Sequence, residues 1–156
     1  MDNSLQETIR KFEQKKKADN EAISLQLMKE NNANEQYARL HSEIDRIARH
    51  DVEGINHCIV GNFLSVLTKS DEIQVIRKEC IESLKFSFDF LYREVQIVFE
   101  GKIKQHKILR VDTKTEPGSD AKPILVYQRL PSESFETIKT SKLQDIVQAS
   151  IEGLIR

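Results

Sequence analysis

Hydrophobic residues near the start of the chain recur at the period of an amphipathic helix. Leu5, Ile9 and Phe12 are spaced four and then three residues apart, which places them on one helical face. An S-x-x-E capping box begins at Ser4 and marks a helix start. The next positions of the stripe are charged, so it does not predict a sustained coiled coil.

A second helical stripe follows a run rich in asparagine. The run is Asn-Asn-Ala-Asn at residues 31–34, and short amide side chains favour turns and caps over helix interiors. Beyond it, apolar residues return at spacings of three, four and three, namely Tyr37, Leu40, Ile44 and Ile47. The pattern predicts a helical hairpin over residues 1–50 with its turn at the asparagine run.

Helical spacing continues after Gly54 and predicts two shorter helices. The apolar positions of the first are Ile55, Ile59, Phe63 and Val66. The second is expected to begin at Ser70, where the acidic residues that follow complement the helix dipole. Its apolar positions are Ile73, Ile76 and Cys80.

The period changes to two at Leu84. The alternating residues are Leu84, Phe86, Phe88, Phe90 and Tyr92, and an alternation rich in aromatic residues is typical of a half-buried strand. A helix through Leu84, Phe88 and Leu91 also fits the spacing and stays an alternative. The next apolar residues fall on odd positions, so a bulge or turn is expected at residues 93–94.

Three further strands are expected to follow. Glu100 and Gly101 mark a hairpin. A two-residue loop would place Phe99 opposite Lys102, whereas a three-residue loop places it opposite Ile103, which buries better and is preferred. Strands at 103–113 and 124–129, separated by an exposed turn at 115–122, complete a four-stranded antiparallel meander.

The C-terminal segment has the clearest helical pattern. Its periodic positions are Leu143, Ile146, Val147, Ser150, Ile151, Leu154 and Ile155. Such a helix must cover an apolar surface, and one face of the meander offers it. The predicted fold class is therefore α+β: N-terminal helical segments, made of the hairpin and two shorter helices, then the four-stranded antiparallel meander covered by a C-terminal amphipathic helix. Two regions are expected, a self-association element at 1–50 and the α+β domain at 51–156.

Composition and motifs exclude several kinds of protein. Among the 156 residues, 24 basic and 25 acidic side chains leave a net charge of −1, so no overall field attracts nucleic acid or a membrane. The sequence has no glycine-rich phosphate-binding motif, and its two cysteines cannot form a zinc or disulfide framework. No metal, cofactor or membrane partner is expected. The N-terminal residues lack the apolar core of a signal peptide, which predicts a cytoplasmic protein.

Acidic residues near the strand ends suggest one enzymatic alternative. Two carboxylates and a lysine at strand ends can hold Mg²⁺ and assist hydrolysis of a phosphodiester. The E-x-K at residues 100–102 and the D-x-K at residues 112–114 loosely resemble the divergent PD-(D/E)xK nucleases, with phenylalanine where that motif has proline. The resemblance implies a catalytic set of Asp89, Glu100, Lys102, Asp112 and Lys114. Ordinary solvated charges are the preferred interpretation, with no catalytic residue.

Basic residues are concentrated on one predicted strand, at residues 102–110. A polyanion site there would consist of Lys102, Lys104, His106, Lys107 and Arg110, and these side chains could follow the phosphates of a nucleic acid. Lysines on a strand also protect a sheet edge from aggregation. Because no aromatic residues are interleaved with them, nucleic-acid binding stays the alternative function.

The amount of amphipathic helix exceeds what four strands can cover. Some apolar stripe is therefore expected to meet another surface, on a second copy or on another protein. The predicted partner-binding residues are Leu5, Ile9, Phe12, Tyr37, Leu40, Ile44 and Ile47. The sequence therefore predicts a non-catalytic interaction protein, most simply a homodimer joined through its N-terminal helices.

Overall fold

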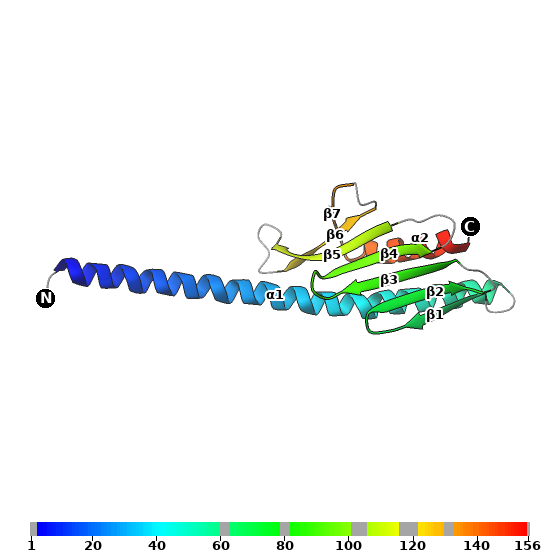
Figure 1. The fold of residues 1–156 in the computed structure, drawn as a ribbon, viewed down its shortest axis with the longest axis horizontal. Helices are drawn as coiled ribbons and strands as arrows, with labels where there is room; N and C mark the ends of the chain where they lie inside the picture. The colour runs from blue at the N-terminus through cyan, green and yellow to red at the C-terminus, as the bar shows by residue number, and fades with distance from the viewer. Residues whose placement is uncertain are drawn as a thin grey trace.

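The computed structural model describes residues 3–59, 63–78, 82–100, 106–115, 122–129 and 133–155. These residues form one long helix, a seven-stranded sheet and a C-terminal helix (Figure 1). The helices are α1 (Asn3–Cys58) and α2 (Lys142–Ile155). The strands are β1 (Leu64–Thr68), β2 (Glu72–Arg77), β3 (Ser83–Asp89), β4 (Glu94–Glu100), β5 (His106–Thr115), β6 (Pro123–Gln128) and β7 (Glu136–Ile138).

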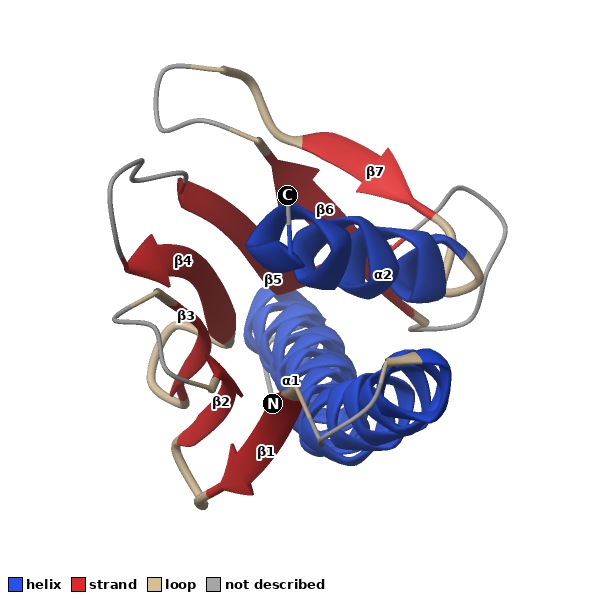
Figure 2. Cartoon of the chain, turned by 90° about the vertical axis from the view of Figure 1, so that its right-hand side faces the viewer, coloured by secondary structure: helices blue, strands red, loops and turns tan. Residues whose placement is uncertain are grey.

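The sheet is an antiparallel meander in which the strands lie in chain order from β1 to β7. It is curved, and both helices lie on its concave side (Figure 2). The predicted meander of four strands is therefore wrong, because β1, β2 and β7 extend it at both edges. The wider sheet offers a surface large enough for α2 and for the C-terminal half of α1.

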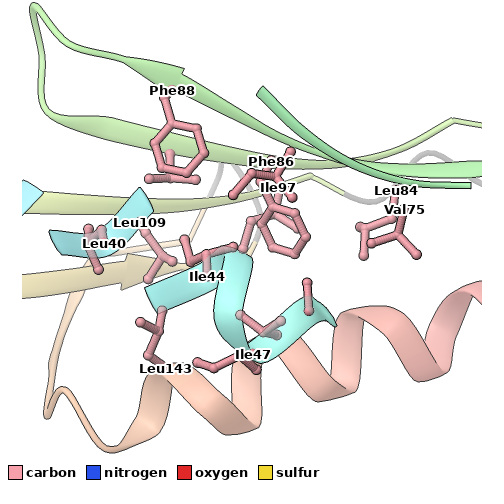
Figure 3. Packing of buried hydrophobic residues seen from close by; sticks show 14 of the residues in the cluster. Leu40, Ile44, Ile47, Val75, Leu84, Phe86, Phe88, Ile97, Leu109 and Leu143 are labelled. Atoms are coloured by element: carbon pink, nitrogen blue, oxygen red, sulfur yellow. The ribbon is translucent and has the colours of Figure 1, made fainter. Parts of the chain in front are cut away.

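The core lies between this concave face and the two helices. Phe86, Ile97 and Leu109 of the sheet are fully buried, as the period-two pattern of a one-sided sheet requires. Side chains of α1, including Ile44, lie between these residues and Leu143 of α2 (Figure 3). The buried stripe of α1 is therefore part of the core of its own chain.

The predicted helical hairpin is wrong, because α1 runs without a break from Asn3 to Cys58. The first 53 residues contain neither glycine nor proline, and an asparagine costs no more than about 0.7 kcal/mol relative to alanine inside a helix. Tertiary contacts offset this cost: Ala33 is buried, and the Asn34 side-chain oxygen accepts a hydrogen bond from Arg93 Nη1 at 3.1 Å. Packing thus overrides the local preference for a turn.

The two shorter helices predicted after Gly54 are also wrong, since α1 continues to Cys58 and the strands β1 and β2 follow it. Ser70 and Asp71, interpreted as a helix start, form the loop of a hairpin instead. The Lys69 amide donates to the Glu72 carbonyl across this loop at 2.7 Å. The β-branched residues of both strands favour this outcome, and Ile73 and Val75 are buried. Cys80 lies outside the described residues.

The C-terminal helix is present as α2, and the strand expected from Leu84 is present as β3. It ends at Asp89, so Phe90 and Tyr92, which the alternation included, lie in the turn that follows. The expected turn also forms at Arg93, which has φ of 50°. The preferred three-residue loop after β4 would place Val98 opposite residue 104, but Val98 lies opposite His106, so that register is wrong. The residues of that loop, 101–105, and most of the turn expected at 115–122 lie outside the described ranges.

Candidate interaction surface

The N-terminal half of α1 extends beyond the sheet (Figure 1). Every side chain from Asn3 to Met28 is exposed, and the first buried residue of the helix is Ala33. We call residues 3–32 the projecting segment. At about 1.5 Å per residue it is about 45 Å long, which is longer than most entire helices of globular proteins.

The projecting segment carries large apolar side chains that its own chain does not cover. Their exposed fractions lie between 43% and 67%. They are Leu5, Ile9, Phe12, Ile23, Leu25, Leu27 and Met28. Single exposed apolar residues are common on protein surfaces, but a series of them along one helix is typical of an interaction surface.

Most of these residues continue the stripe that is buried farther along the helix. Positions spaced alternately by four and three residues run from Leu5 to Ile47, which is the a/d spacing of two helices packed along a seam. Most of these positions are apolar, and the polar ones are Lys16, Asp19, Gln26 and Glu30. Ile9 and Ile23 occupy a positions, and Leu5 and Phe12 occupy d positions. The same seam is therefore buried by the sheet from Ala33 onward and open along the projecting segment.

The structure divides the seven predicted partner-binding residues into two groups. Leu5, Ile9 and Phe12 are exposed on the projecting segment, as a partner surface requires. The other four pack in the core against the sheet, and they are Tyr37, Leu40, Ile44 and Ile47. The accessible part of the predicted surface is thus its N-terminal part.

Tyr37 anchors α1 at the point where the helix leaves the sheet. Its hydroxyl donates a hydrogen bond of 2.6 Å to the Glu94 carbonyl, and its ring makes edge contacts with Phe88 and Phe90. Burial raises the pKa of Tyr37, and the nearby Asp89 and Glu94 carboxylates raise it further. The hydroxyl therefore stays protonated and remains a donor over the whole physiological range.

The turn between β3 and β4 places a second apolar feature beside this anchor. Phe90, Leu91 and Tyr92, which we call the β3–β4 tip, have exposed fractions between 57% and 79%. Asp89 stabilises the turn, because its Oδ1 accepts a hydrogen bond of 3.1 Å from the Leu91 amide. The sequence prediction did not assign the tip to the interaction surface, although three consecutive large apolar residues next to a turn were a signal for it.

The carboxylates of the nuclease alternative do not converge. Asp89 lies opposite Glu94, whereas Glu100 lies opposite Ser83 at the other end of the hairpin, about 20 Å away at about 3.3 Å per residue. Asp112 lies on β5 opposite Ile124. Lys102 is outside the described residues, as is the side chain of Lys114. Within the described part of the chain, no three His, Cys, Asp or Glu side chains could hold a metal ion.

The basic strand does not present one row of cations over its described part. Lys107 faces α2, where its Nζ lies 3.5 Å from Ser150 Oγ, and burial lowers the pKa of Lys107, with a further contribution from Arg129. Arg110 lies on the opposite face, where its Nε donates to Glu94 Oε1 at 2.9 Å and its guanidinium stacks on Phe135. Lys102, Lys104 and the His106 side chain lie outside the described residues.

Replacing Lys107 by methionine is expected to increase the free energy of unfolding modestly at neutral pH. Methionine keeps the apolar stem and removes a charge whose burial disfavours the folded state. Because the folded-state pKa lies below the ordinary value, the folded protein loses this proton first as pH rises, and the advantage of Lys107→Met shrinks at alkaline pH. Urea unfolding at several pH values measures both effects. Lys139→Met, at an exposed position, is the control. If Lys107→Met lowered the free energy of unfolding at neutral pH and the control did not, the charge of Lys107 would stabilise the folded state.

The helices of the described ranges include none that is both long and apolar enough to cross a bilayer. The chain matches no protein-family model, no curated protein and no solved structure. The projecting segment and the β3–β4 tip therefore form the candidate functional surface on structural grounds alone.

Proposed function

We propose that this protein is a non-catalytic interaction module that forms a homodimer through its projecting segment. The observation that carries this proposal is the a/d seam, which the chain's own sheet covers from Ala33 onward and leaves open from Leu5 to Glu30. A second copy of the same segment offers a matching stripe, and two-fold pairing is the commonest way to cover one. The cytoplasmic location stays a prediction from the sequence.

The free energy available from pairing supports this proposal. Burying one Leu, Ile or Phe side chain contributes about 1.5–3 kcal/mol, and each copy brings at least the four a/d residues Leu5, Ile9, Phe12 and Ile23. Two copies together can therefore offset an association cost of about 4–15 kcal/mol. Without a partner, the projecting segment gains nothing from tertiary packing and is stabilised only by helix propensity and by interactions within the helix, such as the ion pairs of Glu7 with Arg10 and Lys11.

Deleting residues 1–28 is expected to convert the dimer to a monomer without unfolding the sheet. The side chains from Asn3 to Met28 are all exposed, so the core loses no contact. Light scattering should give twice 18.1 kDa for the full chain and the monomer mass for the shortened chain. Circular dichroism should show nearly the same melting temperature for both.

Two results would contradict the proposal. One is a monomer mass for the full chain at every concentration through the micromolar range. The other is a shortened chain that stays dimeric, which would place the contact on the sheet or α2. Association only with a different protein would replace the homodimer by a heteromeric complex.

A further inference from the structure

We infer that two copies pair antiparallel through their projecting segments, in the register that places Lys16 of one copy opposite Asp19 of the other. This inference rests on the proposed self-association and specifies its geometry. Three features of the chain support it: the position of the sheet on the seam, the charges within the seam, and the exposed β3–β4 tip.

The position of the sheet disfavours parallel pairing. In a parallel pair, the two helices would run side by side toward the sheets, and the seam of each is occupied by its own sheet from Ala33 onward. The helices would have to separate there. In an antiparallel pair, the N-terminus of each helix lies beside the point where the sheet of the second copy begins. The seam of each helix is then covered by the second copy along the projecting segment and by its own sheet from Ala33 onward.

Charges within the seam specify the same orientation. In antiparallel pairs an a residue of one helix lies opposite a d residue of the other, and Lys16 is at a and Asp19 at d. Placing them opposite each other forms two symmetry-related pairs of opposite charge. A parallel pair would instead place Lys16 against Lys16 and Asp19 against Asp19, and like charges in contact are destabilising.

The remaining layers are compatible with this register. Phe12 then lies opposite Ile23 of the second copy, which forms one apolar layer on each side of the two charged layers. Ile9 lies opposite Gln26, whose amide donates to Glu30 Oε1 at 3.4 Å within the same helix. Shifting one helix by seven residues, so that Lys16 lies opposite Phe12 of the second copy, would remove both the charged pairs and the layers of Phe12 with Ile23.

In this arrangement the β3–β4 tip lies near the N-terminus of the second copy. Leu5 of the second copy reaches Glu30, one helical turn from Asn34, where Arg93 holds the turn against α1. Phe90 of the tip packs on Tyr37, which occupies an a position of the same seam. The exposed Leu91 and Tyr92 thus stand at the end of the open seam, where they can cover the N-terminal turn of the second copy.

Subunit exchange between the wild-type chain and the variant K16E/D19K tests the orientation. Each chain keeps opposite charges at positions 16 and 19, so both are expected to form homodimers of similar affinity. In an antiparallel mixed dimer, Lys16 of the wild-type chain would meet the lysine introduced at position 19, and Asp19 would meet the glutamate introduced at position 16. The mixed dimer is therefore expected at about a tenth of its statistical share. Lys17→Glu, which changes a charge outside the seam, is the control and should exchange statistically.

Native mass spectrometry of isotope-labelled mixtures measures the share of mixed dimer. Depletion of the mixed dimer supports the antiparallel register. A statistical share would overturn the register. Enrichment of the mixed dimer would show parallel pairing, because Lys16 would then meet the glutamate introduced at the same position of the variant; in both cases the proposed homodimer would stand. A wild-type chain that stays monomeric would overturn the proposed function and the register together.

Discussion

Phe12→Asp is expected to weaken self-association by at least about a hundredfold. Phe12 is the most exposed large apolar residue of the projecting segment, with 67% of its surface accessible, and in the antiparallel register it lies opposite Ile23 of the second copy. The dimer contains this layer twice. At about 1.5–3 kcal/mol for each phenylalanine removed from water, two copies amount to about 3–6 kcal/mol, and a buried carboxylate adds its own desolvation cost. Sedimentation equilibrium measures the dissociation constant.

Leu25→Asp is the matched control for this substitution. Leu25 is also exposed on the projecting segment, but its position lies outside the a/d stripe. The same change from a large apolar side chain to aspartate is therefore expected to leave the dissociation constant nearly unchanged. Equal weakening by both variants would mean that the stripe is not the contact. Neither variant should change the melting temperature of the sheet, because neither residue is part of the core.

Phe86→Ala is expected to lower the free energy of unfolding by about 3–5 kcal/mol, the usual cost of removing a buried phenylalanine side chain. Phe86 is fully buried at the centre of the concave face, where it pairs with Ile73 on one side and Ile97 on the other. Domains of this size are stable by only about 5–15 kcal/mol. Urea unfolding should therefore show a large shift of the midpoint.

Phe90→Ala provides the comparison on the same hairpin. Phe90 is mostly exposed, and its described ring contact is the edge contact with Tyr37. Such a contact contributes about 0.5–1.5 kcal/mol, so the expected loss is a fraction of that for Phe86→Ala. If the two variants lost equal stability, the concave face would not be the core of the sheet.

The strongest local patterns were enough to predict α2 and β3. In α2 seven positions keep the helical period, and in β3 the aromatic alternation coincides with the alternation of burial. The weaker patterns failed because two structures fitted them equally well. Val66 and Ile73 satisfy a helical period and a strand period, and only the pairing of β1 with β2 decides between the two.

The interaction surface could be predicted only in part for a related reason. An a/d pattern shows that a stripe must be covered, but it does not show by what. Leu5 and Tyr37 belong to one pattern, yet Leu5 stays exposed while Tyr37 is buried by the chain's own sheet. The asparagine run hid this continuity, because its preference for a turn suggested two separate helices. The position of the sheet along α1 depends on long-range packing that no local pattern reports.

Hydrogen–deuterium exchange of the full chain at two protein concentrations tests the proposed association most directly. In the monomer, the amides of the projecting segment are protected only by a helix without tertiary contacts, so they exchange quickly. We expect slow exchange at residues 5–30 at high micromolar concentration, fast exchange at nanomolar concentration, and no change in the amides that join β3 to β4. Fast exchange of the projecting segment at both concentrations would contradict the proposed self-association.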